Sequence, residues 1–188
     1  MKPELKIELE RLQHILESNG LEFTLSEGAT AEEIAEVEAK VGIVFDTDLK
    51  DLWQLSNGSK ESDIWFAVFS DELTPCSFTS LEDALECWSW FLPYDESTYE
   101  EWSDVEAERD ERIQPAFLHH RLWFPFAEFN GFSTSIVFDG DPTDKGEYGQ
   151  ILVYQHDPDA IYYVAENFLE FFKKSNDLLQ TNAKELLF

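Results

Sequence analysis

Hydrophobic positions recur at helical spacing in the N-terminal part of the chain. Leu5, Leu9, Leu12 and Leu16 repeat at intervals of three and four residues, and Gly20 follows them. This spacing places the leucines on one side of an amphipathic helix, and glycine is a frequent stop. The pattern therefore predicts a first helix that ends before Gly20.

Two further helices are predicted before residue 60. Thr30 and Glu33 form a capping box, because each side chain can satisfy a free backbone N–H of the other residue. The helix that starts there ends at Gly42. A third, short helix extends from about Thr47 to Ser56, and Asn57-Gly58 is its exit turn.

The middle of the chain changes to strand patterns. The segment 63–70, "DIWFAVFS", is short and rich in aromatic and β-branched residues, which predicts a strand. Helical spacing returns in 80–92, where Ser80 and Asp83 can cap the helix. The segments 122–139 and 150–157 are predicted strands, and the first of them is turned at Asn130-Gly131.

The final helix is predicted to begin near Ala165, with Val164, Phe168, Leu169 and Phe172 on its buried face. Helices thus come first, strands occupy the middle, and a helix ends the chain. This order predicts an α+β fold, in which N-terminal helices and a C-terminal helix flank a mainly antiparallel central sheet. The length of 188 residues predicts one domain, residues 1–188.

Charge narrows the class of partner. The chain has 40 acidic against 13 basic residues, a formal net charge of -27, yet 43% of its residues are hydrophobic, so it folds. Such a charge argues against direct binding of nucleic acid, which depends on Lys and Arg, and would repel anionic membranes. A basic protein is the partner that it favours, and the alternative is that the acidic surface serves only solubility or adaptation to salt. We find neither a signal peptide nor a membrane span, and expect a cytoplasmic protein.

The stretch 138–158, "FDGDPTDKGEYGQILVYQHDP", raises the question of a calcium loop or a carboxylate pair. The calcium pattern fails, because Asp144 and Gln150 stand where an EF-hand requires Gly and Glu. Catalytic carboxylates need unlike environments, of which this polar loop gives no sign. We expect a turn, in which Asp139 ends one strand and Gln150 begins its antiparallel partner.

The sequence contains no complete motif for catalysis, metal binding or phosphate binding elsewhere. The segment 131–135, "GFSTS", lacks the last glycine of a nucleophile elbow, and adjacent His119 and His120 have no third metal ligand at a diagnostic spacing. We expect Cys76 and Cys87 to be reduced and buried. No phosphate-binding loop is present. The sequence gives no positive reason to predict an enzyme, a metal or a cofactor.

Several segments occur in an order known from one protein family. They are "LSEGATAEEIAEVEAKVG" (25–42), "VFDTDLKDLWQLSNG" (44–58), "LWFPFA" (122–127), "FDGDPT" (138–143), "YGQILVYQHDP" (148–158) and "VAENFLEFF" (164–172). In this succession the chain resembles the SUKH superfamily, from about Leu21 to Lys173. Asp46 stands where the family pattern has proline, and it can cap the same helix end.

The resemblance implies a binding function. Small bacterial members are immunity proteins that neutralise toxins, often nucleases, whose basic clefts an acidic protein can occupy. The segment 95–111 has nine acids and one base around two aromatic residues. We expect the cognate toxin to contact Tyr99, Glu100, Glu101, Trp102, Asp104, Glu106 and Glu108.

Alternatives remain open for that segment and for the function. Trp102 could pack in the core, with the acids only solvating their helix or loop. Instead of an immunity protein, the chain could be a regulatory scaffold in cell-wall and glucan synthesis, as the yeast member of the family implies. An enzyme is the third possibility, and it is disfavoured because no nucleophile, metal set or phosphate loop is found.

Overall fold

The computed structural model of this chain describes residues 1–60, 63–94, 109–115 and 119–187. Helices lead the chain, six strands follow, and a long helix closes it, so the predicted α+β fold is confirmed. The elements are α1 (Pro3–Ser18), α2 (Ala31–Val41), α3 (Thr47–Leu55), β1 (Ile64–Phe69), β2 (Leu73–Phe78), α4 (Leu81–Phe91), the 3-10 helix η1 (Leu92–Tyr94), β3 (Trp123–Phe129), β4 (Thr134–Asp139), β5 (Gln150–Gln155), β6 (Ala160–Ala165) and α6 (Phe168–Leu186).

The helices α2 and α3 begin where their capping residues predict. Thr30 and Glu33 form the full capping box of α2, and Gly42 ends that helix with a left-handed φ of 76°. Asp46 is the N-cap of α3, where its carboxylate accepts a hydrogen bond from the Leu49 N–H at 2.7 Å. The residue that departs from the family pattern therefore still begins the helix.

All six strands form one antiparallel sheet in chain order, β1 to β6. Two of the strands, β2 and β6, were not predicted by the hydrophobic pattern. The prediction that the last helix begins near Ala165 was wrong, because Ala165 ends β6. That helix, α6, begins at Phe168 after its N-cap Asn167, and Val164 lies in β6.

Both faces of the sheet are buried over much of its area, which explains why the strand residues do not alternate with polar ones. In β5, Ile151 and Val153 belong to the main core, whereas Leu152 and Tyr154 belong to a second cluster with Ile113. All six residues of β4 are buried. The main core lies against α1, α3 and α6, and the second cluster is covered by residues that precede β3.

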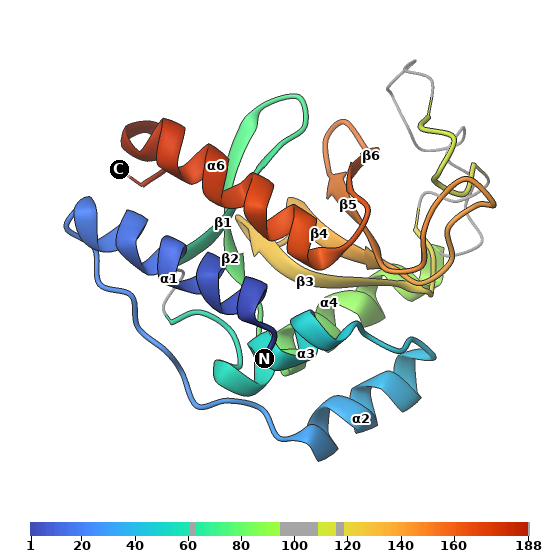
Figure 1. Cartoon of the computed structure of the whole chain (residues 1–188). Coiled ribbons are helices and arrows are strands. Elements are labelled where there is room, and N and C mark those ends of the chain that lie inside the picture. The colour runs from blue at the N-terminus through green and yellow to red at the C-terminus, as the bar shows by residue number, and fades with distance from the viewer. Residues whose placement is uncertain (61–62, 95–108, 116–118, 188) are drawn as a thin grey trace.

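The sheet is curled, and α6 lies across it between the edge strands β1 and β6 (Figure 1). Two adjacent side chains of α6 bind opposite edges. Ser175 Oγ accepts a hydrogen bond from the Ala67 N–H of β1 at 2.9 Å. Lys174 Nζ donates to the Val164 carbonyl of β6 at 2.7 Å. Because free edge groups would otherwise need water or another strand, α6 both covers the core and occupies the edges.

This arrangement predicts that Ser175→Ala destabilises the protein. The substitution leaves the buried Ala67 N–H without a partner, which costs about 1–3 kcal/mol of unfolding free energy. Urea unfolding followed by circular dichroism measures the loss. Thr181→Ala, at an exposed position on the same helix, is the matched control. Equal stability of the two variants would contradict the role of Ser175.

Candidate functional site

The acidic loop between β4 and β5 is a structural turn, as the sequence predicts. Asp139 ends β4 and is paired with Gln150, the first residue of β5. The Gly149 N–H donates to the Asp139 carbonyl at 2.8 Å and closes the loop. The described residues contain no group of three His, Cys, Asp or Glu that could hold a metal ion.

The Asp139 side chain is a buried hub rather than a surface turn residue. It has no exposed area, and its carboxylate accepts three hydrogen bonds. Oδ1 accepts from Trp123 Nε1 at 2.8 Å and from the Asp141 N–H at 2.9 Å, and Oδ2 accepts from Gln150 Nε2 at 2.8 Å. Gln150 Nε2 also donates to the Arg112 carbonyl at 2.9 Å, which ties the segment before β3 to the sheet.

Burial raises the pKa of the Asp139 carboxyl to about 6, against the opposing effect of its three hydrogen bonds. A shifted carboxyl in a cleft would be a catalytic candidate. This one has no solvent access, however, and every oxygen is bonded to a residue that holds the fold. Its geometry is that of a structural brace between β4, β5 and the segment around Arg112.

Neither cysteine is an activated nucleophile. Both thiols are free and buried, as predicted. Burial raises the pKa of Cys76 and of Cys87, so both remain protonated at neutral pH. The structure places Cys87 on the inner side of α4, where burial outweighs the opposing effect of a hydrogen bond with Ser135.

An open surface depression of about 590 Å³ lies where α4, the β3–β4 turn and the β5–β6 turn meet. We call this depression the aromatic hollow. It is lined by Trp90, Phe91, His119, Asn130, Gly131, Phe132, Ser133, Tyr154, His156 and Asp159. These three parts of the chain and His119, which precedes β3, therefore build one surface depression at the end of the second cluster.

His119 forms the floor of the aromatic hollow. Its ring stacks on Phe91, with centroids 4.2 Å apart, and meets the edge of Tyr154 at 4.5 Å. Burial lowers the pKa of the His119 imidazole to about 4, so the ring is neutral at physiological pH. His119 thus serves as an aromatic packing residue there, which agrees with the prediction of an ordinary histidine.

The β5–β6 turn supplies the polar wall of the hollow. The Tyr154 hydroxyl donates to Asp159 Oδ1, and the same oxygen lies 2.9 Å from Nδ1 of His156. Burial and the Asp159 carboxylate both raise the pKa of Tyr154, so its hydroxyl is a donor and not a base. The wall can therefore orient a polar group, but it contains no activated nucleophile.

One rim of the hollow is an aromatic pair that we call the aromatic ridge, Trp90 and Phe132. Their rings meet edge to face with centroids 6.0 Å apart, and Trp90 is 53% exposed. Phe132 has a φ of 67°, in the left-handed region that large residues rarely adopt. The Phe132 N–H donates to Glu128 Oε2 at 2.9 Å, which holds the turn in this conformation.

Comparison with known proteins shows the family of this chain. The sequence model of the SMI1 / KNR4 family (SUKH-1) matches residues 28–174. The chain belongs to this family. The match confirms the resemblance predicted from the motifs, and its C-terminal limit lies next to the Lys173 limit of the prediction. A comparison with curated proteins found no match.

The predicted partner contact of this SUKH-1 protein lies outside the described residues. It comprises residues 99–102, Asp104, Glu106 and Glu108. The described chain stops at the end of η1, directly after the α4 residues that line the aromatic hollow, and resumes at Arg109. The Arg109 guanidinium lies over the Trp123 ring, 5.5 Å from its centroid. Arg109 therefore packs on β3.

Sequence reasoning missed the aromatic ridge. Trp90 lies outside the apolar face of α4 that Leu81, Ala84 and Trp88 define, so a large aromatic residue on the polar face was the available signal. Phe132 directly follows the Asn130-Gly131 turn, a position that gave no signal for a tertiary contact.

Among the described residues, no helix has the length and apolar character to cross a bilayer.

The buried carboxyl of Asp139 predicts a specific pH dependence of stability. Its pKa is higher in the folded protein than the ordinary 3.8, so the folded state binds the proton more tightly. The resulting stabilisation is fully present below about pH 4 and is lost as the pH rises through about 6. The shift corresponds to at most about 3 kcal/mol.

We expect Asp139→Asn to gain about 1–3 kcal/mol less than the wild type when the pH falls from 7 to 4.5. Urea unfolding curves at the two pH values measure the gain. Asp144→Asn, at an exposed position in the same loop, removes a charge without a buried site and should behave like the wild type. A wild-type slope in Asp139→Asn would rule out this titration.

Proposed function

We propose that this SUKH-1 protein is a non-catalytic protein-binding module, a cytoplasmic immunity protein that neutralises a basic toxin. The family includes immunity proteins and cell-wall regulators. The observation that carries the proposal is the exposed aromatic ridge, which stands on a chain of net charge -27. Apolar anchors on a strongly charged surface are typical of a surface that binds another protein.

Charge supports the choice of a basic partner. An excess of 27 negative charges produces a long-range field that accelerates encounter with a positively charged protein. A nuclease toxin presents a basic cleft for its substrate, so an acidic protein of this kind can occupy it. The acidic segment 95–111, which the sequence singled out, follows α4 and η1 directly in the chain.

The backbone at Phe132 supports a role outside folding. A non-glycine residue in the left-handed region costs about 1–3 kcal/mol, and such residues concentrate at functional sites. Phe132 is only half-buried, and its ring meets the exposed Trp90 ring edge to face. Display of the Phe132 ring beside Trp90 gives a reason for an aromatic residue at this position.

The family also supports a second candidate, a regulatory scaffold in cell-wall synthesis. Both candidates bind proteins, and the partner distinguishes them. Co-purification with a toxin encoded by the adjacent gene would support immunity. Co-purification with wall-synthesis enzymes would support the scaffold.

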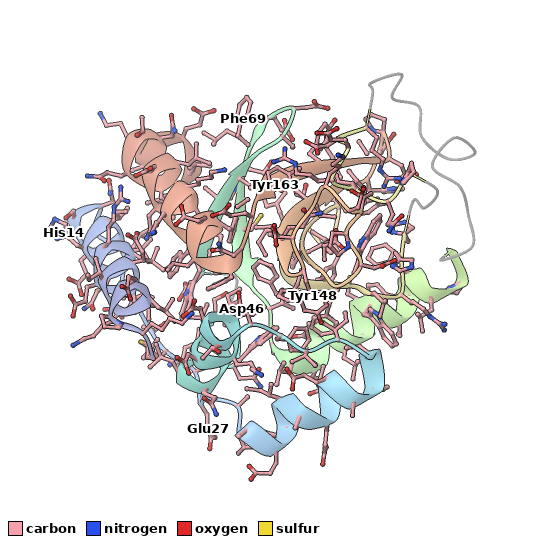
Figure 2. The ribbon with its side chains drawn as sticks, turned by 45° about the vertical axis from the view of Figure 1, so that its right-hand side comes forward. His14, Glu27, Asp46, Phe69, Tyr148 and Tyr163 are labelled. Carbon is pink, nitrogen blue, oxygen red and sulfur yellow. The ribbon has the colours of Figure 1, made fainter. Side chains whose placement is uncertain are left out.

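Removal of the aromatic ridge should weaken partner binding. We expect Trp90→Ala to raise the Kd for the co-purified partner by about 30-fold or more, because an exposed tryptophan at the centre of an interface contributes about 2 kcal/mol. Isothermal titration calorimetry measures the effect, and thermal melting confirms the fold. Phe69→Ala is the matched control, because Phe69 is 63% exposed at the tip of β1, at the opposite end of the molecule from α4 (Figure 2). Equal loss in both variants would contradict the assignment.

Charge reversal in the acidic segment should act on the association rate. We expect Glu100→Lys/Glu101→Lys to lower the rate constant about tenfold in low salt, with a smaller effect in high salt, because screening removes steering. Stopped-flow association with the partner measures it. Glu10→Lys/Glu185→Lys makes the same charge change on α1 and α6 and should have a weaker effect. Identical rates in the two variants would argue against a contact at 95–111.

A further inference from the structure

The aromatic hollow contains a carboxylate oxygen that a bound molecule can reach. Asp159 lines the hollow, and its side chain is 17% exposed. Its Oδ1 accepts from the Tyr154 hydroxyl and lies 2.9 Å from Nδ1 of His156. Its Oδ2 has no hydrogen-bond partner among the described residues, and it is not one of the unpaired atoms that are closed off from solvent. One oxygen of Asp159 is therefore both free and accessible.

The Tyr154 hydroxyl fixes the position of this carboxylate. Tyr154 belongs to β5 and is only 5% exposed, so its ring is held in the second cluster. Asp159 directly precedes β6, the strand that pairs with β5. A carboxylate that accepts from a buried donor keeps its orientation better than one on a freely rotating surface side chain. The fold thus determines where the negative charge lies.

Aromatic rings supply the rest of the binding surface. Phe91 and the two rings of the aromatic ridge line the hollow, and Trp90 is 53% exposed, so ring surface is open to solvent. The described lining contains no Lys or Arg. Arg109 acts on His119 through its charge, but its guanidinium lies over the Trp123 ring, outside that lining. The hollow therefore combines aromatic ring faces with one free negative oxygen.

We propose that the aromatic hollow binds a lysine side chain of the basic partner protein. The negative faces of aromatic rings attract a cation, and tryptophan is the strongest of them. The ammonium group can at the same time donate to Asp159 Oδ2. The apolar stem of lysine covers ring surface while its charged end reaches the polar wall. This inference rests on the proposed function, because the lysine belongs to the partner that the function requires.

The single free oxygen favours lysine over other cations. A guanidinium binds a carboxylate best through two parallel hydrogen bonds, which need both oxygens, and Oδ1 of Asp159 is already engaged. An ammonium is a compact charge that needs only one. A metal ion needs several ligands, and the described residues contain no group of three His, Cys, Asp or Glu that could hold one.

Titration with a small peptide tests the site without knowledge of the partner. The probe is acetyl-Gly-Lys-Gly-amide, added to the isotopically labelled full chain and followed by two-dimensional NMR. At about pH 7.5 free imidazole is mostly neutral, and about 0.15 M salt screens the general field of the acidic surface. We expect a Kd of about 1–10 mM. The shifts should occur at the Trp90 indole N–H and at the amides of Ser133, His156 and Asp159, all in the lining.

The norleucine peptide is the matched control, because it has a stem like that of lysine without the ammonium group. It should bind about tenfold more weakly or not at all. Equal binding of the two peptides would overturn the proposal, and so would shifts spread evenly over the acidic surface. Tighter binding of the arginine peptide would overturn the choice of lysine. The absence of local shifts at about 20 mM lysine peptide would overturn the site.

Two variants separate the charge from the rings. Asp159→Asn should weaken binding of the lysine peptide by about tenfold, because the amide keeps the shape of the side chain without its charge. Asp157→Asn makes the same charge change at an exposed position in the same turn and should bind like the wild type. Trp90→Leu, at an exposed position, should weaken binding by about threefold. Thermal melting checks the fold of each variant, and unchanged affinity in both Asp159→Asn and Trp90→Leu would contradict the assignment.

The failures of the two proposals are distinguishable. Binding of the lysine peptide at Asp159 in a protein that co-purifies with no basic partner would contradict the immunity function and support the lysine site. A tight complex with a toxin whose Kd is unchanged by Asp159→Asn would support the function and overturn the lysine site.

Discussion

The fold depends on how its curled sheet is closed. Six antiparallel strands bring the edge strands β1 and β6 to the two sides of α6, and each edge carries backbone groups that need partners. Lys174 and Ser175 satisfy one group on each edge, while Phe168, Phe171 and Phe172 pack against Phe66 in the core. Polar closure and aromatic packing thus come from the same turns of one helix. A helix that supplied only the phenylalanines would leave both edges open to other strands.

The helix α6 covers one face of the sheet, and the other face, which carries the second cluster, is covered in a different way. Among the described residues, the second cluster is covered by residues before β3 such as Ile113. Asp139 holds this cover in place, because the same Gln150 amide binds the Asp139 carboxylate and the Arg112 carbonyl. Arg112 in turn lies over the Tyr163 ring of β6, 3.2 Å from its centroid. The aromatic hollow lies at the end of this cluster, since Tyr154 and Phe91 belong to both.

The sequence contained most of the fold, and its errors have physical reasons. Thr30, Asp46 and Ser80 located helix starts because capping is decided within four residues. The pairing of Asp139 with Gln150 followed from turn residues between two apolar strands. The strand β2 was missed because Pro75 and its polar neighbours lower strand propensity, and pairing with β1 overrides this. The strand β6 was merged with the helix after it, since apolar residues continue across the Asn167 cap. The aromatic hollow was out of reach, because it joins α4 to turns that are distant in sequence.

Charge and shape have different parts in the proposed recognition. A net charge of -27 attracts any basic molecule and cannot by itself select one. Selection needs groups with fixed positions, and the aromatic ridge is held by the α4 backbone on one side and by Glu128 on the other. A partner with the right charge and no group for the aromatic hollow would associate quickly and dissociate quickly, because steering raises association rates while the lifetime of a complex depends on close contacts. In the proposed recognition, specificity would therefore reside in the ridge and the aromatic hollow, and the acids elsewhere on the surface would act mainly on the rate of encounter.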